Sequence, residues 1–329
     1  ELANGKDTAD SASEPAQQTE GEPDAGSSAT ALAEPGAGVV SPKAKPEYTM
    51  RFIYQDLQAF LGGMMSQVEP TRITTQSGSS IPAVFVPAPD GGVLTLLYSH
   101  GNAVDIGEML PFWLMLSRSL NVNVFGYEYT GYGDSRGPPE QPTEGQTYLD
   151  IEAAYAALIK RVPANTVVLY GQSVGSGPSC HMAGRGTIAG VVLHSGLMSG
   201  LNVLRPPQSG SCLASCCAPS CLLCCCDVYR NIDKISNFTC PVCILHGRDD
   251  EVIAFQHAER LYAKCRPASK SEPYWPAGAR HNDLVEHNHD AYISRLNTFL
   301  RALESSLQPA ASDAAPTPPT GAATPVTAM

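Results

Sequence analysis

From residue 93 onward, short apolar runs rich in β-branched residues alternate with longer stretches in which apolar residues recur at helical spacing. The apolar runs predict strands at 93–100, 121–129, 166–170, 188–195 and 240–247. The longer stretches predict helices at 107–120, 145–162, 254–265 and 289–303. Strands buried on both faces are continuous apolar runs, and their alternation with helices indicates a mostly parallel, doubly wound sheet. The sequence therefore predicts an α/β fold.

Two segments precede this alternation and follow a different pattern. Residues 51–65 favour a helix, for which packing on the domain is preferred over lying on a membrane. Residues 81–88 are typical of an edge strand at the antiparallel start of the sheet.

The two ends of the 329-residue chain differ in composition from its middle. Residues 1–45 are mostly Ala, Glu, Asp, Ser, Gly and Pro, and residues 308–329 are mostly Pro, Ala and Thr. Such compositions bury too little apolar surface to offset the entropy of ordering, so both ends are expected to be disordered. Residues 46–307 then form one domain, with a cysteine-rich insertion at 205–227.

Charge and hydropathy exclude two classes of protein. Much of the net charge of −11 comes from the first 45 residues, which leaves the middle only mildly acidic. Nucleic-acid binding needs clustered Lys and Arg, and no basic stripe is visible. No apolar run approaches the roughly 18–20 residues of a membrane-spanning helix.

The stretch "LYGQSVGSG" places Ser173 directly after a predicted strand and before a predicted helix. In the strand-to-helix turn called the nucleophile elbow, a strained backbone pushes the serine Oγ out of the sheet. Small residues are needed two positions before and after the serine, where a side chain would collide with the neighbouring strand and helix. Gly171 and Gly175 meet this need, so Ser173 is the candidate nucleophile rather than a polar residue in a glycine-rich turn.

A serine hydroxyl needs a base, and His281 is the best placed histidine. It lies in a loop between a short strand at 272–276 and the last predicted helix. His287 and His289 are rivals, but they fall among polar residues at the start of that helix. The remaining histidines include three expected to be packing residues and one expected on the helix after Ser173: His194, His246, His257 and His181.

The acid of a triad is expected after the strand at 240–247, in "HGRDDEV". We favour Asp250 over Asp249, and Glu251 also fits the gap. The chain order Ser173, Asp250, His281 is that of α/β-hydrolases and differs from the orders in chymotrypsin and subtilisin.

An oxyanion site needs two backbone donors. One is expected from Val174, at the start of a helix whose dipole favours negative charge. The other is expected from Asn102 or Ala103 in the loop "SHGNA", which His100 and Gly101 shape.

Long words of the sequence resemble the α/β-hydrolase domain-containing protein 17 family over about residues 92–303. They include "LLYSHGNAVDIGEM", "NVFGYEYTGYGDSRG", "LYGQSVGSGPS", "HGRDDEVI" and "GARHND". The resemblance implies an α/β-hydrolase fold and a serine hydrolase that removes palmitoyl groups from cysteines of membrane-attached proteins. It also implies that Ser173, Asp250 and His281 are the triad.

The chain departs from that family at two places. Arg280 directly precedes His281, at a position where a small residue is expected. Its positive charge could lower the pKa of His281, or its side chain could point to solvent; we favour the second orientation. The second departure is the position of a cysteine cluster, which in related proteins is a palmitoylated N-terminal anchor. Here it falls between the strands at 188–195 and 240–247, in a region that commonly forms a cap over the site.

Seven of the eleven cysteines form this cluster: Cys212, Cys216, Cys217, Cys221, Cys224, Cys225 and Cys226. Zinc favours separated Cys-x-x-Cys pairs, and the consecutive run 224–226 suits a tetrahedral site poorly. Disulfides would leave one thiol over and need an oxidising compartment. S-acylation needs accessible thiols among apolar residues, and no charged residue falls between 212 and 226. We therefore favour S-acylation over zinc, disulfides or plain burial. Several acyl chains on adjacent thiols would make a stable membrane anchor.

These observations predict a thioester or ester hydrolase on the cytoplasmic face of membranes, monomeric, with no cofactor and no metal. Its expected partners are S-acylated membrane proteins and the membrane surface. The alternatives are a lipase, carboxylesterase or serine peptidase on the same fold, or a noncatalytic binding module that kept the fold.

Overall fold

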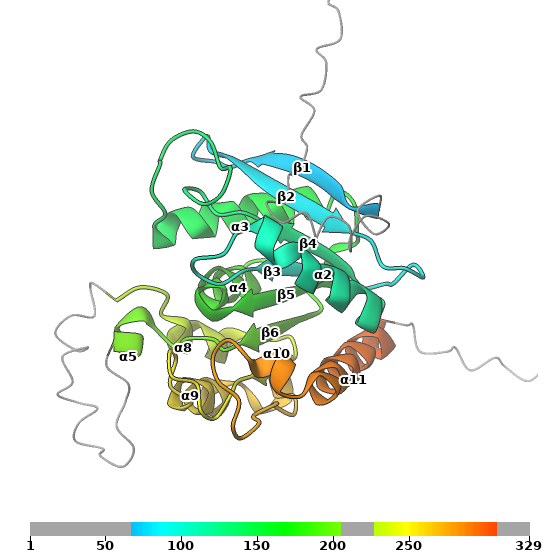
Figure 1. Cartoon of the computed structure of the whole chain (residues 1–329), viewed down its shortest axis with the longest axis vertical. Coiled ribbons are helices and arrows are strands. Elements are labelled where there is room, and N and C mark those ends of the chain that lie inside the picture. The colour runs from blue at the N-terminus through cyan, green and yellow to red at the C-terminus, as the bar shows by residue number, and fades with distance from the viewer. Residues whose placement is uncertain (1–66, 205–226, 308–329) are drawn as a thin grey trace, which may run out of the picture. The chain divides into compact units, whose positions relative to one another are not determined.

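The computed structural model describes residues 67–204 and 227–307 (Figure 1). The expected tails at 1–45 and 308–329, the helix expected at 51–65 and all seven clustered cysteines lie outside the described residues. The domain boundaries and the cysteine-rich insertion therefore stay predictions.

Seven strands form one sheet in the order β1-β2-β4-β3-β5-β6-β7 (Figure 1). The strands are β1 Glu69–Thr74, β2 Ser80–Val86, β3 Thr95–Ser99, β4 Asn123–Tyr127, β5 Val167–Gln172, β6 Gly190–His194 and β7 Val242–Leu245. From β4 to β7 all neighbours are parallel, while β2 is antiparallel to both β1 and β4. The predicted strands and the mostly parallel sheet are confirmed.

The prediction of an edge strand at 81–88 was wrong. This segment is β2, which pairs with β1 on one side and β4 on the other. The edge belongs to β1, whose sequence "EPTRIT" is mostly polar and in which only Ile73 is buried. The short strand expected at 272–276 is reduced to isolated parallel bridges, from Lys270 to Val242 and from Tyr274 to Leu245.

Helices connect the parallel strands, as the helical spacing predicts. They are α2 Ile106–Leu120, α3 Glu144–Leu158, α4 Ser176–Ala183, α5 Gly200–Leu204, α8 Asn231–Lys234, α9 Gln256–Lys264, α10 Leu284–His287 and α11 His289–Leu307. The side chain of Asp105 caps α2 by accepting from the Glu108 N–H at 3.0 Å, and Thr143 caps α3 through the Gln146 N–H at 3.1 Å. Each cap satisfies one of the N–H groups that a helix start leaves unpaired.

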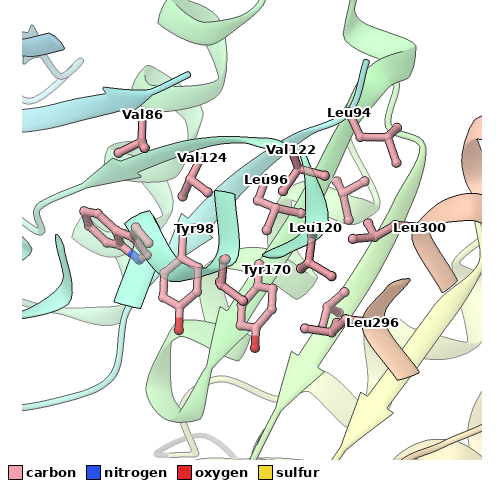
Figure 2. Close-up of a cluster of buried hydrophobic side chains, with 14 of the residues drawn as sticks. Val86, Leu94, Leu96, Tyr98, Leu120, Val122, Val124, Tyr170, Leu296 and Leu300 are labelled. Atoms are coloured by element: carbon pink, nitrogen blue, oxygen red, sulfur yellow. The ribbon is translucent and has the colours of Figure 1, made fainter. Parts of the chain in front are cut away.

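The core lies on both faces of the sheet. On one face, α2 and α11 pack Trp113, Leu296 and their neighbours against side chains such as Tyr98 and Tyr170 (Figure 2). On the other face, α3, α4 and α9 pack against strand residues of the opposite alternation. Burial on both faces explains why the central strands are apolar throughout.

The parallel strands place their following loops at one edge of the sheet. β3 ends at Ser99, just before the loop 100–103; β5 ends at Gln172, just before Ser173; and β7 ends at Leu245, just before the acidic run 249–251. In sheets of this kind, sites form beyond the carboxyl ends of the strands.

Candidate active site

Ser173 lies in a strained turn between β5 and α4. Its φ of 52° is in the left-handed region, which non-glycine residues seldom adopt. A Cβ at Gly175 would lie 2.1 Å from the carbonyl oxygen of Ser99, and one at Gly171 would lie 2.7 Å from that of Gly175. Backbone sits at both places, so neither glycine could carry a side chain without a shift of the chain. The local geometry is that of the predicted elbow.

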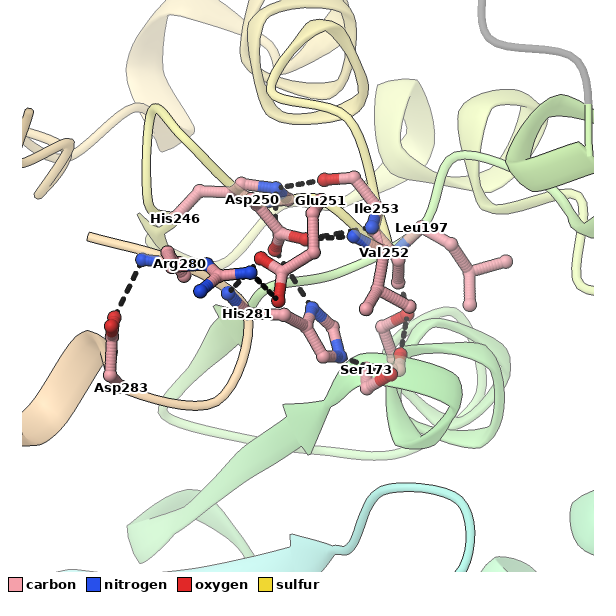
Figure 3. Close-up of polar contacts among 11 residues, drawn as sticks. Ser173, Leu197, His246, Asp250, Glu251, Val252, Ile253, Arg280, His281 and Asp283 are labelled. Atoms are coloured by element: carbon pink, nitrogen blue, oxygen red, sulfur yellow. Dashed lines mark hydrogen bonds and ion pairs between the residues drawn. The ribbon is translucent and has the colours of Figure 1, made fainter. Parts of the chain in front are cut away.

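His281 stands between Ser173 and Asp250 (Figure 3). Its Nε2 lies 3.2 Å from Ser173 Oγ, and its Nδ1 lies 2.8 Å from Asp250 Oδ2. Since a carboxylate accepts, Nδ1 is the donor, which leaves Nε2 free to accept the hydroxyl proton. Three side chains that are far apart in the sequence thus form one hydrogen-bonded line.

Asp250 is fixed from several sides. Its Oδ1 accepts from the backbone N–H of Ile253 at 2.7 Å and of Val252 at 3.0 Å, and His246 Nε2 lies 3.3 Å from its Oδ2. Burial alone would raise the pKa of this carboxyl, but the hydrogen bonds from His246 and His281 outweigh it and hold the pKa well below its usual range. The acid therefore stays a carboxylate and can stabilise an imidazolium.

The two acids beside Asp250 hold the histidine loop instead of the histidine ring. Asp249 Oδ2 accepts from the backbone N–H of Gly278 at 2.6 Å, and Glu251 Oε2 accepts from the N–H of His281 at 3.3 Å. Of the three acids, Asp250 is the one hydrogen-bonded to the His281 ring, and its role as the acid of a triad stays a prediction. The positioning contacts of Asp249 and Glu251 were not predicted.

Arg280, next to the histidine, points to the surface. Its guanidinium lies 3.1 Å from Glu251 Oε1, and both side chains are largely exposed. Its backbone N–H donates to Asp283 Oδ1 at 2.6 Å (Figure 3). This is the solvent-facing orientation that was preferred for Arg280.

Of the described histidines, only His281 is hydrogen-bonded to Ser173 Oγ. His194 and His257 are buried with partners of their own, Tyr170 and the Met198 N–H. His246 is buried, and its Nε2 lies 2.7 Å from the Ile253 carbonyl oxygen and 3.3 Å from Asp250 Oδ2. The sequence did not reveal this contact with the acid. His181 lies on α4, and the rivals His287 and His289 are exposed.

The loop after β3 borders the serine. A Cβ at Gly101 would lie 3.7 Å from Ser173 Cβ, and Ala103 has a φ of 60°, so the chain turns sharply here. Asn102 accepts a hydrogen bond from the Tyr132 hydroxyl through its side chain. Val174 follows Ser173 in the same turn. The candidate oxyanion donors Val174, Asn102 and Ala103 thus lie in the turn of Ser173 and in the loop that borders it, and their role stays a prediction.

A buried contact between a histidine and a glutamate anchors that loop. His100 Nε2 lies 2.9 Å from Glu128 Oε1, and the two side chains are 0% and 1% exposed. The carboxylate also accepts from the backbone N–H groups of Ile106 and Tyr129. Glu128 was missed because a lone Glu after a strand is usually solvated.

The four cysteines in the described part of the chain are poor nucleophiles. Burial raises the pKa of Cys180 and Cys243 to about 12 and that of Cys240 and Cys265 to about 11. Because the thiolate is the reactive form of cysteine, these thiols are inert. Within this part of the chain, Ser173 is the hydroxyl hydrogen-bonded to His281, and its role as nucleophile stays a prediction.

A mostly parallel sheet with a strained serine after a central strand, and with Asp and His supplied by later loops, defines an α/β hydrolase. Solved structures agree on the fold. The chain superposes on the Penicillium α/β hydrolase GrgF with a TM-score of 0.57 at 14% identity, covering 72% of this chain and 99% of that one. It superposes on the Pyrococcus furiosus esterase Pf2001 with a TM-score of 0.56 at 16% identity, covering 74% and 95%.

Sequence comparison shows the family. The chain is 42% identical over 238 residues to alpha/beta hydrolase domain-containing protein 17C of Xenopus laevis, covering 72% of this chain and 70% of the relative. It is 42% identical over 236 residues to protein 17B of Homo sapiens, covering 71% and 75%. No family model matches the chain. The chain belongs to the alpha/beta hydrolase domain-containing protein 17 family, and it is a hydrolase.

Within residues 67–204 and 227–307, no helix has both the length and the apolarity needed to span a bilayer.

Proposed function

We propose that this chain is a serine hydrolase that cleaves S-acyl thioesters from cysteines of membrane-associated proteins. The observation that carries the proposal is the continuous line from Ser173 Oγ through His281 to Asp250, at 3.2 and 2.8 Å. Hydrogen-bond reach between nucleophile, base and orienting acid is the signature of an activated serine.

The reaction runs in two halves. His281 Nε2 takes the hydroxyl proton while Ser173 Oγ bonds to the acyl carbon, and the C–S bond breaks as the thiolate leaves and receives that proton. Water then gives a proton to His281, attacks the acyl-serine, and releases the fatty acid as the proton returns to Ser173. Asp250 keeps the imidazole oriented and stabilises its charged form in both halves.

Thioesters suit this site because of their leaving group. A cysteine thiol has a pKa of about 8.5, so a thiolate departs without full protonation in the transition state. An amide nitrogen needs a proton delivered from the histidine as it leaves. The resemblance of long sequence stretches to the family is the reason for proposing palmitoyl-cysteine, among possible esters and thioesters, as the substrate.

The membrane part of the proposal concerns the seven cysteines at 212–226, which lie outside the described residues. Several S-acyl chains on adjacent thiols would hold the enzyme on the cytoplasmic face of a membrane, where acylated substrates are concentrated. Replacing all seven by serine and fractionating cells tests this. Release to the cytosol is expected, and unchanged membrane binding would contradict the anchor.

The activity itself is tested with a thioester, an ester and an amide that share one acyl group. The wild type is expected to hydrolyse the thioester with the highest kcat/KM, and Ser173→Ala to lose turnover of all three. Ser305→Ala, which removes an exposed hydroxyl on α11, serves as the control and should match the wild type. Preference for the ester or the amide would contradict the assignment of thioesters.

A further inference from the structure

A cavity of about 410 Å³ opens beside the elbow. Its lining includes Val174 of the elbow, Tyr129 and Tyr132 after β4, Thr147 of α3, and Val228 and Tyr229 before α8. Most of the lining is aromatic or aliphatic, and the volume is in the range of sites for small organic ligands. The cavity is adjacent to Ser173 because Val174 is the next residue in the chain.

The cavity lies on the oxyanion side of Ser173. Its two aromatic wall residues are hydrogen-bonded to the loop after β3: the Tyr129 hydroxyl donates to the His100 carbonyl at 2.7 Å, and the Tyr132 hydroxyl donates to Asn102 Oδ1. None of the described residues that line the cavity comes from the acid loop at 246–253 or the histidine loop at 278–283.

The position of the cavity relative to His281 suggests where the leaving group and the acyl chain of a substrate would lie. The leaving group has to stand near His281 Nε2, which returns the proton to it. The carbonyl oxygen has to face the oxyanion donors. The remaining substituent of the reacting carbon, the acyl chain, is then directed away from His281 and toward the cavity past Val174.

The walls of the cavity are fixed by contacts of their own. Tyr229 has a φ of 50°, its N–H donates to Glu144 Oε1 at 2.7 Å, and its ring packs so closely on α4 that a Cβ at Gly177 would lie 2.0 Å from it. Thr130, which follows the lining residue Tyr129, donates to Asp150 of α3 through its N–H at 2.8 Å and its hydroxyl at 2.7 Å. The cavity is thus part of the folded domain.

The charged residue in the lining does not make the cavity a site for cations. The Glu144 carboxylate accepts from the Tyr148 hydroxyl and from the Tyr229 N–H, so its acceptor oxygen is engaged by the wall. The ammonium of Lys234 donates to the Tyr148 hydroxyl at 2.6 Å. Because Glu144 is the one charged residue among the described lining residues, which are mostly aromatic and aliphatic, the ligand that suits the cavity is a neutral apolar chain.

We propose that this cavity holds the hydrocarbon chain of the acyl group, with Val228 at its rim. The proposal rests on the proposed function and adds where the chain binds. Val228 is 41% exposed, and its side chain lies beside Gly200, so a larger residue there would narrow the entrance without replacing a core residue.

The test uses the full chain and a series of thioesters from butyryl to palmitoyl. Val228→Trp is expected to lower kcat/KM for palmitoyl by about tenfold or more while leaving butyryl within about twofold, because burial of each methylene is lost only for the long chain. The matched control is Val93→Trp, which alters a 56% exposed valine before β3, and it should leave the whole series unchanged. Equal effects of Val228→Trp on all chain lengths, or none, would overturn the proposal.

A second measurement does not depend on thioester turnover. The rates at which a short-alkyl and a long-alkyl fluorophosphonate label Ser173 report chain binding directly. Wild type should react faster with the long reagent, and Val228→Trp should lose that preference. If both variants label equally fast with either reagent, the chain binds elsewhere and the hydrolase assignment stands. If Ser173 is not labelled at all, the proposed function itself fails.

Discussion

Asp250 Oδ2 lies 2.8 Å from Nδ1 of His281, although 30 residues separate the two in the chain. Asp249, the preceding acid, turns the other way and accepts from the Gly278 N–H. Asp250 therefore contacts the imidazole of His281, whereas Asp249 contacts the loop that carries His281.

Exchanging each acid for its amide separates these roles. Asp250→Asn is expected to lower kcat on a soluble thioester by about 10⁴-fold, because an amide can place the wrong tautomer of the histidine in front of the serine. Asp249→Asn keeps an oxygen that can accept from Gly278, so its kcat should stay within about threefold of the wild type. Steady-state kinetics of the two variants measure this difference in kcat. Equal losses would mean that either acid can serve the histidine.

The elbow tolerates no side chain at Gly175. Gly175→Ala would place a Cβ 2.1 Å from the Ser99 carbonyl oxygen, so β3 and the turn would have to separate and Ser173 would leave the reach of His281. We expect loss of activity and a lower midpoint in thermal unfolding. Gly145→Ala on α3 is the control, since nothing lies within 4 Å of its Cβ. It should keep full activity and gain up to about 1 kcal/mol of stability.

The buried pair of His100 and Glu128 holds the loop that borders the serine. Glu128→Gln replaces one of two acceptor oxygens by a donating NH2 group, so at least one buried donor at this position loses its acceptor, which typically costs about 1–3 kcal/mol of unfolding free energy. Urea unfolding measures this loss. Glu69→Gln breaks an exposed pair with Arg161 and should leave the unfolding midpoint unchanged. A stable Glu128→Gln protein would show that the pair contributes little to the fold.

Stability should fall between pH 7 and pH 5 because of a buried histidine. Burial, then the nearby charges of His281 and His246, lowers the pKa of His194 to about 3. Unfolded His194 takes up a proton below about pH 6.5 while the native ring stays neutral, so acid favours unfolding by roughly 2 kcal/mol at pH 5. The lowered pKa of Asp250 acts only below the ordinary aspartate range, outside this window.

Urea unfolding at the two pH values measures this dependence. His194→Asn has no ring to protonate, so its loss of stability from pH 7 to pH 5 should be smaller than that of the wild type by about 2 kcal/mol. The same loss in both proteins would place the dependence on other groups.

The sequence predicts the parallel strands and the helices between them well, because burial on both faces leaves an unmistakable apolar pattern. It also predicts Ser173 and His281, since few positions combine the right residue with the end of a strand. The prediction that residues 81–88 form an edge strand was wrong for a physical reason. β2 contains Pro82 and looks interrupted, yet it lies between β1 and β4, where pairing depends on a distant strand.

Other parts of the site could not be predicted from local patterns. Asp249, Asp250 and Glu251 are chemically similar and adjacent, and only the course of the histidine loop decides which carboxylate meets which donor. Glu128 is unremarkable in the sequence, because its burial depends on its contact with His100 from the loop after β3. The cavity beside Val174 is built from four separate segments, so no single stretch indicates it.

The most direct test of the account is covalent labelling with a fluorophosphonate, followed by mass spectrometry of the digested protein. The wild type should carry a single adduct on the peptide that contains Ser173, and a folded Ser173→Ala variant should carry none. An adduct of equal yield in Ser173→Ala, or one located on another serine of the wild type, would contradict the role assigned to this residue.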